Sequence, residues 1–353
     1  METTPYPQGT VIGEKYVITR CIGRGASAAV YAADDERLER QVALKIFQPP
    51  PFPEEAERFL KRFQAEGKTL ASLDHPHIVT VFDCGETPEN EPYLAMEFID
   101  GPSVGDLVAG QPLSIERTLH LATQACKALS YAHQRGIVHR DLKPSNLMIR
   151  HGDHGVDHIK LVDFGLVQHV QSDQSFSRDK RIVGSPHCMA PEQILGLNLD
   201  HRADLYALGN ILFFMLTGHY PFERESSMLT MMAHTKEAVP SMSTVNPEAD
   251  VPADLEAIVR RCLQRDADAR FSSADEIQRA LQSKGPANKG PLRLASVPAQ
   301  QLLREKSFAT SSMVALVLAT VALIGFSVFW TLTHPSSVGT LGKQQPDIPA
   351  ATR

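Results

Sequence analysis

The sequence has few cysteines, no excess of basic residues and no apolar run at its start. Its five cysteines are scattered over 353 residues without paired spacing, which argues against a disulfide framework or a zinc site and fits a reducing compartment. A formal net charge of −6 gives no indication of a nucleic-acid partner. The first ten residues, METTPYPQGT, are polar, so we expect no signal peptide.

The composition is otherwise that of a globular protein, with 42% hydrophobic and 22% charged residues. Within it, the stretch HRDLKPSN (139–146) places Asp141, Lys143 and Asn146 close together, and Pro144 excludes a regular helix there. Such a loop can direct three polar groups into one small volume. The acid can take a proton from a hydroxyl, the lysine can steady a phosphate, and the amide oxygen can bind a divalent metal.

A glycine turn lies between two predicted strands near the start of the chain. Tyr16 to Ile22 reads as the first strand, and Gly23-Arg24-Gly25 precedes a second apolar stretch. Two glycines allow backbone N–H groups to approach an anion closely. A plain β-turn would show the same pattern. A dinucleotide fingerprint is a further alternative, although that motif opens a helix and residues 29–33 look extended.

The next two predicted elements, a strand and a helix, each carry a charged residue on an apolar face. Alternation along the predicted strand 41–47 puts Lys45 on the same face as Ala43. This lysine either extends its ammonium group to water at a strand edge or binds phosphates in a cleft. Glu66 falls on the apolar stripe of the predicted helix 54–73. A carboxylate on that face needs a partner, and Lys45 is the natural one.

From Ser114 onward the hydrophobic period becomes helical, and Cys126 falls on the buried stripe of the first such helix. A later strand, 159–162, leads into Asp163-Phe164-Gly165, 17 residues after Asn146. Both side chains can therefore meet at one metal, and their oxygens suit Mg²⁺. Three histidines between these motifs suggest a metal site or, more simply, a solvated hairpin turn: His151, His154 and His158.

The order of these motifs from Tyr16 to Leu281 resembles that of eukaryotic-type protein kinases, and is similar to the single-span membrane Ser/Thr kinases of bacteria. The resemblance implies an α+β, bilobal fold after a leader over 1–15. A small β-rich lobe with one helix would cover 16–98, and a mainly helical lobe 99–281. It implies transfer of the γ-phosphoryl group of ATP to Ser or Thr hydroxyls of proteins, and autophosphorylation.

The resemblance also implies roles for single residues. Asp141 would accept the substrate proton and Lys143 would stabilise the transferred phosphoryl group, while Asn146 and Asp163 would hold Mg²⁺, with Mn²⁺ as an alternative. The implied nucleotide-binding set is Ile22, Gly23, Arg24, Gly25, Ala26, Ser27, Ala28, Val30, Ala43, Lys45, Glu66, Glu97 and Ile99. Here Glu97 and Ile99 belong to the segment between the lobes. The family has a third glycine where this chain has Ala28.

A polar segment, 168–188, would be the activation segment, and Met189-Ala190-Pro191-Glu192 matches the A-P-E motif. The resemblance implies that Arg140 receives a phosphate at Ser177 and that Ser185 contacts Asp141 and Lys143. Two residues of this segment differ from the usual sequence of the family: Ser185 stands in place of Thr, and Cys188 in place of Tyr. Two further contacts are expected from the family: Asp204 with the backbone of the catalytic loop, and Arg270 with Glu192.

The end of the chain predicts a membrane anchor. Residues 282–309 read as a linker with more basic than acidic residues, and residues 313–330 contain no charged side chain. A helix over 311–333 would be long enough to cross a bilayer of roughly 30 Å. A buried core helix is the alternative. We expect a single-pass protein of the inner membrane, with the kinase domain in the cytoplasm and a short extracytoplasmic tail over 334–353.

The expected partners are ATP, proteins with Ser or Thr acceptors, membrane lipid and a second copy for autophosphorylation, and no nucleic acid. The main rival function is a nucleotide-binding pseudokinase scaffold, which Ala28 and the two activation-segment departures favour. A dinucleotide-binding enzyme is a weaker rival, because Lys45, Glu66 and the helical second part of the sequence do not suit it.

Overall fold

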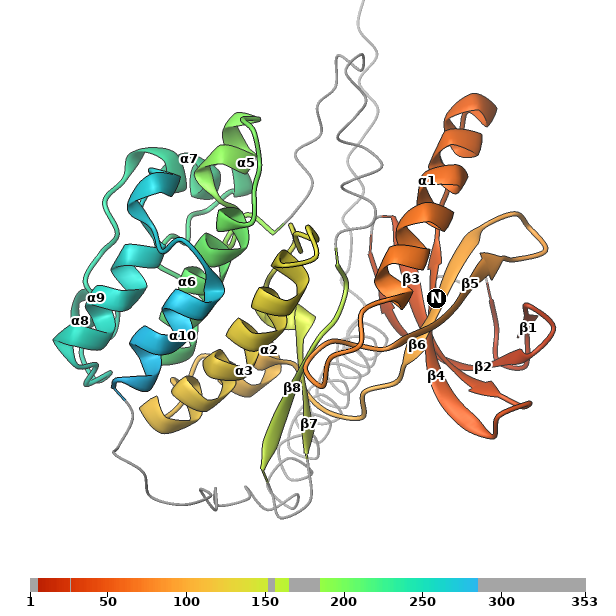
Figure 1. Ribbon diagram of the computed structural model, residues 1–353, viewed down its shortest axis with the longest axis horizontal. Helices are drawn as coiled ribbons and strands as arrows, with labels where there is room; N and C mark the ends of the chain where they lie inside the picture. Colours follow the sequence, from red (N-terminus) through yellow and green to blue (C-terminus); the bar gives the residue numbers. More distant parts are fainter. Residues whose placement is uncertain (1–5, 26, 152–155, 165–184, 285–353) are drawn as a thin grey trace, which may run out of the picture. The chain divides into compact units, whose positions relative to one another are not determined.

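The computed structural model describes residues 6–25, 27–151, 156–164 and 185–284 (Figure 1). The chain divides into two compact units, Met1–Arg293 and Leu294–Arg353. All described residues belong to the first unit. Its first part is a sheet with one long helix, and its second part is mainly helical, so the expected α+β class is confirmed for the described residues.

The first part is an antiparallel sheet with the strand order β1-β2-β3-β4-β6-β5. Its elements are β1 (Val11–Ile12), β2 (Tyr16–Arg24), β3 (Ala28–Asp35), β4 (Arg40–Phe47), α1 (Pro53–Ala71), β5 (Val81–Glu86) and β6 (Pro92–Glu97). Helix α1 packs on β5 and β6 through an apolar stripe that includes Phe59 and Phe63. Two of these strands, β1 and β5, were not foreseen from the sequence.

The two faces of β4 separate as the alternation predicts. Val42, Leu44 and Ile46 belong to one buried cluster with Tyr31, whereas Phe47 packs in the main core with residues of α1. Lys45 lies on the Phe47 face, and its backbone is opposite Val30 of β3. The strand therefore points the lysine toward the side of the sheet that α1 covers.

The segment before residue 16 packs on the sheet, although the sequence suggested a polar leader. Tyr6 is buried, and its ring meets Tyr31 edge to face with centroids 6.0 Å apart. Its hydroxyl lies 2.8 Å from a carboxylate oxygen of both Glu89 and Glu91. This aromatic side chain with a polar tip and the pairing of β1 with β2 thus fix a segment that shows no apolar periodicity.

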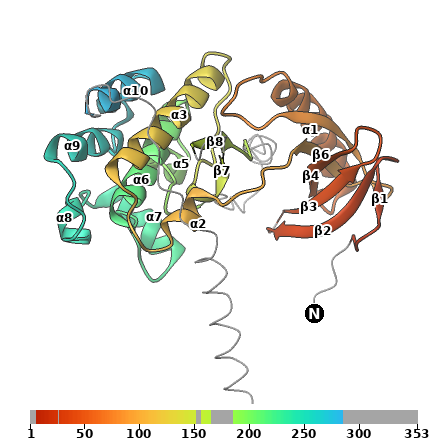
Figure 2. The same cartoon turned by 90° about the horizontal axis from the view of Figure 1, so that it is seen from below.

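The second part contains α2 (Val104–Val108), α3 (Ile115–His133), α5 (Pro191–Leu195), α6 (Arg202–Thr217), α7 (Ser227–Lys236), α8 (Met242–Val245), α9 (Ala253–Cys262) and α10 (Ala274–Gln282). Helix α6 is buried nearly all round, as its continuous apolar sequence predicts. It packs on α3 and α9, while α10 packs on α3 (Figure 2). Cys126 on α3 is fully buried, which confirms it as a core residue.

A short hairpin of β7 (Leu147–His151) and β8 (Asp157–Leu161) carries the histidines noted in the sequence. His151 pairs with Asp157 at 3.0 Å, His158 is exposed, and His154 lies outside the described residues. Within the described ranges, no group of three or more His, Cys, Asp or Glu side chains is placed to hold a metal. The two described histidines lie on the strands of this hairpin, and the solvated-turn interpretation stays a prediction.

No helix within the described residues is long and apolar enough to span a membrane. The predicted span 311–333, the tail 334–353 and the linker beyond residue 284 lie outside those residues.

Candidate functional site

The backbone of the loop 139–146 is held by Asp204, which is 1% exposed on α6. Its carboxylate accepts hydrogen bonds from the backbone N–H of His139 (2.8 Å) and of Arg140 (2.9 Å). Arg140 has φ +65°, a left-handed conformation that a non-glycine residue adopts only when its surroundings enforce it. Burial opposes ionisation of Asp204, but the hydrogen bond to His133, with the charge of His133, outweighs it and lowers the pKa of Asp204. The predicted contact with the loop backbone is confirmed.

The three polar side chains of this loop lie close together. Lys143 Nζ lies 2.7 Å from Asp141 Oδ2. Asn146 is 3% exposed, and its side-chain nitrogen donates to the backbone carbonyl of Asp141 at 2.8 Å. Pro144 begins a 3₁₀ turn, Pro144–Asn146, so the loop avoids an α-helix as its proline requires.

Asp163 joins this loop to the sheet. The N–H of Val162 donates to the carbonyl of Asn146 at 2.9 Å, which places Asp163 next to the loop. Asp163 also forms an ion pair with Lys45 of β4, with Nζ and Oδ2 2.9 Å apart. The following residue, Phe164, is buried, and its ring lies 4.6 Å from that of His139. Charged groups from two distant parts of the sequence thus meet at one place.

The donor set suits a hard divalent cation. Because the Asn146 nitrogen is committed to the Asp141 carbonyl, its oxygen is left as the acceptor. Asp163 adds a carboxylate that is only partly buried, with 27% of its side chain exposed. Carboxylate and carboxamide oxygens are the ligands that Mg²⁺ and Ca²⁺ prefer.

The glycine turn forms a β-hairpin between β2 and β3. The N–H of Gly25 donates to the carbonyl of Ala28 at 2.8 Å, which closes the turn. A Cβ atom at Gly23 would meet no other atom within 4 Å, so the structure shows no close contact that requires glycine there. Ala28, in place of the family's third glycine, packs its methyl group against the main core. Ala26 lies outside the described residues.

The segment that follows the sheet approaches the β7–β8 hairpin closely. Glu97 is the last residue of β6, and Ile99, two residues later, is 8% exposed. A Cβ on Gly101 would lie 1.9 Å from the carbonyl oxygen of Ile149, so glycine alone allows this approach. The Glu97 carboxylate also pairs with Lys160 at 2.7 Å, a contact that the sequence did not suggest.

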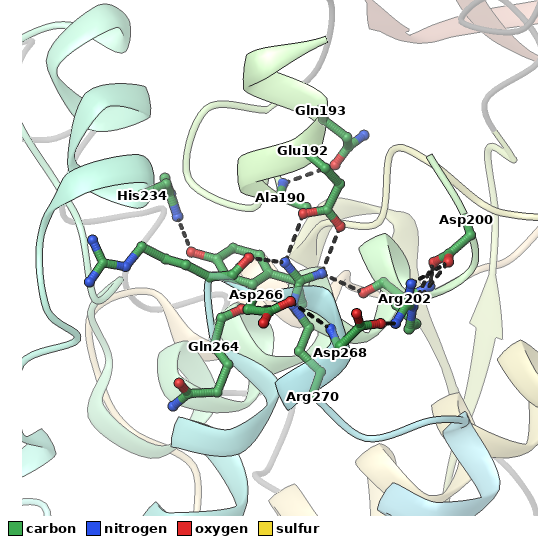
Figure 3. Close-up of polar contacts among 12 residues, drawn as sticks. Ala190, Glu192, Gln193, Asp200, Arg202, His234, Gln264, Asp266, Asp268 and Arg270 are labelled. Carbon is green, nitrogen blue, oxygen red and sulfur yellow. Dashed lines mark hydrogen bonds and ion pairs between the residues drawn. The ribbon is translucent and has the colours of Figure 1, made fainter. Parts of the chain in front are cut away.

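A salt bridge fixes the helix α5 that follows residue 185 (Figure 3). Arg270 is 2% exposed, and both of its terminal nitrogens lie 2.7 Å from carboxylate oxygens of Glu192. Its guanidinium lies 4.8 Å from the ring centre of Tyr206. The predicted pairing of Arg270 with Glu192 is confirmed.

His234, on α7, contributes to this network through Tyr206 (Figure 3). Its Nδ1 lies 2.8 Å from the Tyr206 hydroxyl, and the residue is fully buried. Burial, with the nearby charge of His187, lowers the pKa of His234 to about 4. Because the unfolded chain takes up a proton near pH 6.5 and the folded chain only near pH 4, this contribution to stability is complete above pH 6.5 and is lost as the pH falls to 4.

We therefore expect His234→Gln to remove part of the acid destabilisation between pH 6.5 and 4. The wild-type loss from this residue should be on the order of 3 kcal/mol. Urea unfolding at several pH values in this range measures it. The exposed His158, changed in the same way, is the control and should leave the pH profile as it is. Equal profiles for wild type and His234→Gln would contradict the assignment.

For three further predicted site residues, the structure does not confirm the predicted contact. Glu66 is half-buried on α1, and its pairing with Lys45 stays a prediction, since the ion pair described for Lys45 is with Asp163. Ser185 and Asp141 line one small cavity, but no hydrogen bond between them is described. Ser177 lies outside the described residues.

The fold and the site together define a sheet-and-helix unit in which a lysine, two aspartates and an asparagine converge beside a glycine hairpin. The model of the protein kinase domain family matches residues 16–284. The chain belongs to this family. A small, curled sheet and a larger helical part form its bilobal fold, and the family in general uses ATP and a divalent metal.

The chain is similar to several bacterial proteins. The chain is 34% identical to the serine/threonine-protein kinase PrkC of Bacillus subtilis over 282 residues, 80% of this chain and 42% of PrkC. It is 34% identical to PknB of Mycobacterium tuberculosis over 278 residues, 76% of this chain and 43% of PknB. The crystal structure of the Mycobacterium tuberculosis PknI kinase domain superposes with a TM-score of 0.61 at 29% identity, covering 79% of this chain and 99% of that domain. The match thus spans only about two-fifths of the curated relatives.

Proposed function

We propose that this protein is a serine/threonine protein kinase that transfers the γ-phosphoryl group of ATP to hydroxyl groups of proteins, including its own. The observation that carries the proposal is the convergence of Lys45, Asp163 and the 139–146 loop. One hydrogen bond, from Val162 N–H to the Asn146 carbonyl, ties the loop to the segment that leads from β8 to Asp163. PrkC and PknB are both named serine/threonine-protein kinases, which supports the choice of acceptor.

Each residue has a role in this proposal. Asp141 accepts the proton of the attacking hydroxyl, and Lys143, 2.7 Å away, stabilises charge on the transferred group. Asn146 and Asp163 hold Mg²⁺, which neutralises phosphate charge when bound. Lys45 orients the phosphates, and Glu66 keeps Lys45 in place.

The remaining nucleotide-binding residues lie in the glycine hairpin, on β4, and at the end of β6 with the segment that follows it. Backbone N–H groups of the hairpin face the phosphates, and the backbone at Glu97 and Ile99 bonds the base. The complete set is Ile22, Gly23, Arg24, Gly25, Ala26, Ser27, Ala28, Val30 and Ala43, with Glu97 and Ile99. Arg140, Ser177 and Ser185 form the regulatory part of the proposal, in which Arg140 binds a phosphate on Ser177.

The proposal includes a membrane anchor. The uncharged run within 311–333 supports a single span, with the kinase domain at 16–281 on the cytoplasmic side and the tail 334–353 outside. A second copy of the chain is the expected partner for autophosphorylation.

Phosphoryl transfer tests the function. The full chain, in detergent or membranes, is incubated with γ-labelled ATP and Mg²⁺ and a generic basic protein substrate, followed by phosphoamino-acid analysis. We expect label on Ser and Thr and none without a divalent metal. A chain that binds ATP but transfers no label to protein would instead be a nucleotide-binding scaffold.

A further inference from the structure

Lys160 on β8 is a buried charge that the proposed mechanism does not use. It is 8% exposed, and its ammonium group lies 2.7 Å from Glu97 Oε2 and donates to the carbonyl of Ile78 at 3.1 Å. Lysine is almost never buried without a partner, and burying such a pair seldom gains stability over an apolar side chain. The pair therefore needs a reason other than stability.

The strand that carries Lys160 is a fixed frame. The N–H of Leu161 donates to the carbonyl of His77, and the N–H of Val79 donates to the carbonyl of Leu161, both at 2.9 Å. On its other side, β8 pairs with β7 along its whole length. Lys160 thus projects from a strand that is bonded on both edges.

Glu97, in contrast, lies where the sheet ends. It is the last residue of β6, and the chain then leaves the ladder toward Gly101. Its backbone N–H is bonded to the carbonyl of Thr80 at 2.8 Å. One oxygen of its carboxylate, Oε2, pairs with the ammonium group of Lys160. The other, Oε1, lies 3.6 Å from a guanidinium nitrogen of Arg150, whose side chain is 63% exposed. The buried lysine is therefore the closer and less solvated of its two cationic neighbours.

We infer that Lys160 is a positioning residue for the nucleotide base. Its bond to Glu97 holds the end of β6 at one distance from β8, so that the backbone at Glu97 and Ile99 keeps the geometry that the base requires. This rests on the proposed function, in which that backbone bonds the base edge. Small displacements of such groups are costly for binding, because the hydrogen bonds need defined lengths and angles.

The test is the affinity of Lys160→Met for two probes, measured by calorimetry with Mg²⁺ on the full chain. We expect the Kd for ATP to rise about tenfold, and the Kd for tripolyphosphate, which has no base, to stay within about twofold. Lys160→Arg, which keeps the charge, should recover most of the ATP affinity. Arg150→Met, at the exposed neighbour of the same carboxylate, is the matched control and should change neither Kd.

The double variant Glu97→Met/Lys160→Met separates positioning from the cost of an unpaired buried charge. Lys160→Met alone should lower the melting temperature, because it leaves the Glu97 carboxylate without its buried partner. The double variant removes both charges, so it should restore the melting temperature while the Kd for ATP stays raised. A double variant with wild-type ATP affinity, or a Lys160→Met that weakens both probes equally, would overturn the inference. Since binding is measured directly, this result is independent of phosphoryl transfer, whose absence would count against the proposed function alone.

Discussion

Replacing Asp141 by Asn should abolish phosphoryl transfer and leave ATP binding intact. The amide cannot take the proton of the attacking hydroxyl, and a positioned general base contributes roughly 10²- to 10⁴-fold to a rate. The substitution is nearly isosteric. Asn146 bonds the backbone carbonyl of residue 141 and not its side chain, so the loop should keep its shape. Initial rates with γ-labelled ATP, and the Kd for ATP by calorimetry, measure the two effects.

The exposed Asp34 on β3 provides a matched control, because Asp34→Asn makes the same chemical change away from the site. Its transfer rate should equal that of the wild type. In Asp141→Asn, Lys143 loses the charge of its 2.7 Å partner but keeps an amide oxygen that can accept its hydrogen bond, so the Kd for ATP should stay close to that of the wild type. A variant that retains more than about a tenth of the wild-type rate would remove Asp141 from its role as the base.

Elements that depend on neighbouring residues could be predicted from the sequence. Contacts between segments far apart in the sequence could be predicted only where the resemblance to a family implied them. The strand with Lys45 follows from period-two alternation and the buried helix α6 from a continuous apolar sequence, and both are properties of neighbouring residues. The resemblance predicted the contacts of Asp204 with the catalytic loop and of Arg270 with Glu192, and the structure contains both contacts.

The pair Lys160–Glu97 was missed, because a lysine in a short strand reads as a surface residue until its neighbours in space are known. Tyr6 was missed for the same reason: its hydroxyl partners lie 81 to 85 positions away, and its ring packs on Tyr31 of β3. The ion pair of Lys45 with Asp163 was also not foreseen, although both residues were assigned to the site. In all three cases the sequence shows the residue type but not the long-range contact that gives it a role.

The salt bridge between Arg270 and Glu192 should contribute the largest single effect on stability among the contacts in Figure 3. The Arg270 side chain is fully buried, and the guanidinium also donates to three backbone carbonyls, at 2.7, 3.0 and 3.1 Å. Those carbonyls belong to Gln264, Arg202 and Arg265. A change at this position therefore leaves both a largely buried carboxylate, with 11% of its side chain exposed, and several backbone acceptors without donors.

We expect Arg270→Met to lower the free energy of unfolding by about 3–5 kcal/mol, the cost of breaking a buried pair from one side. Arg270→Lys should recover only part, because an ammonium group cannot bind the Glu192 carboxylate with two parallel hydrogen bonds. Chemical unfolding at pH 7 measures both. Asp268→Asn, which breaks the exposed pair of Asp268 with Arg202 in the same view, should cost less than about 1 kcal/mol. Equal losses for Arg270→Met and Asp268→Asn would show that burial does not set the strength of the Arg270 bridge, and that helix α5 is held by other contacts.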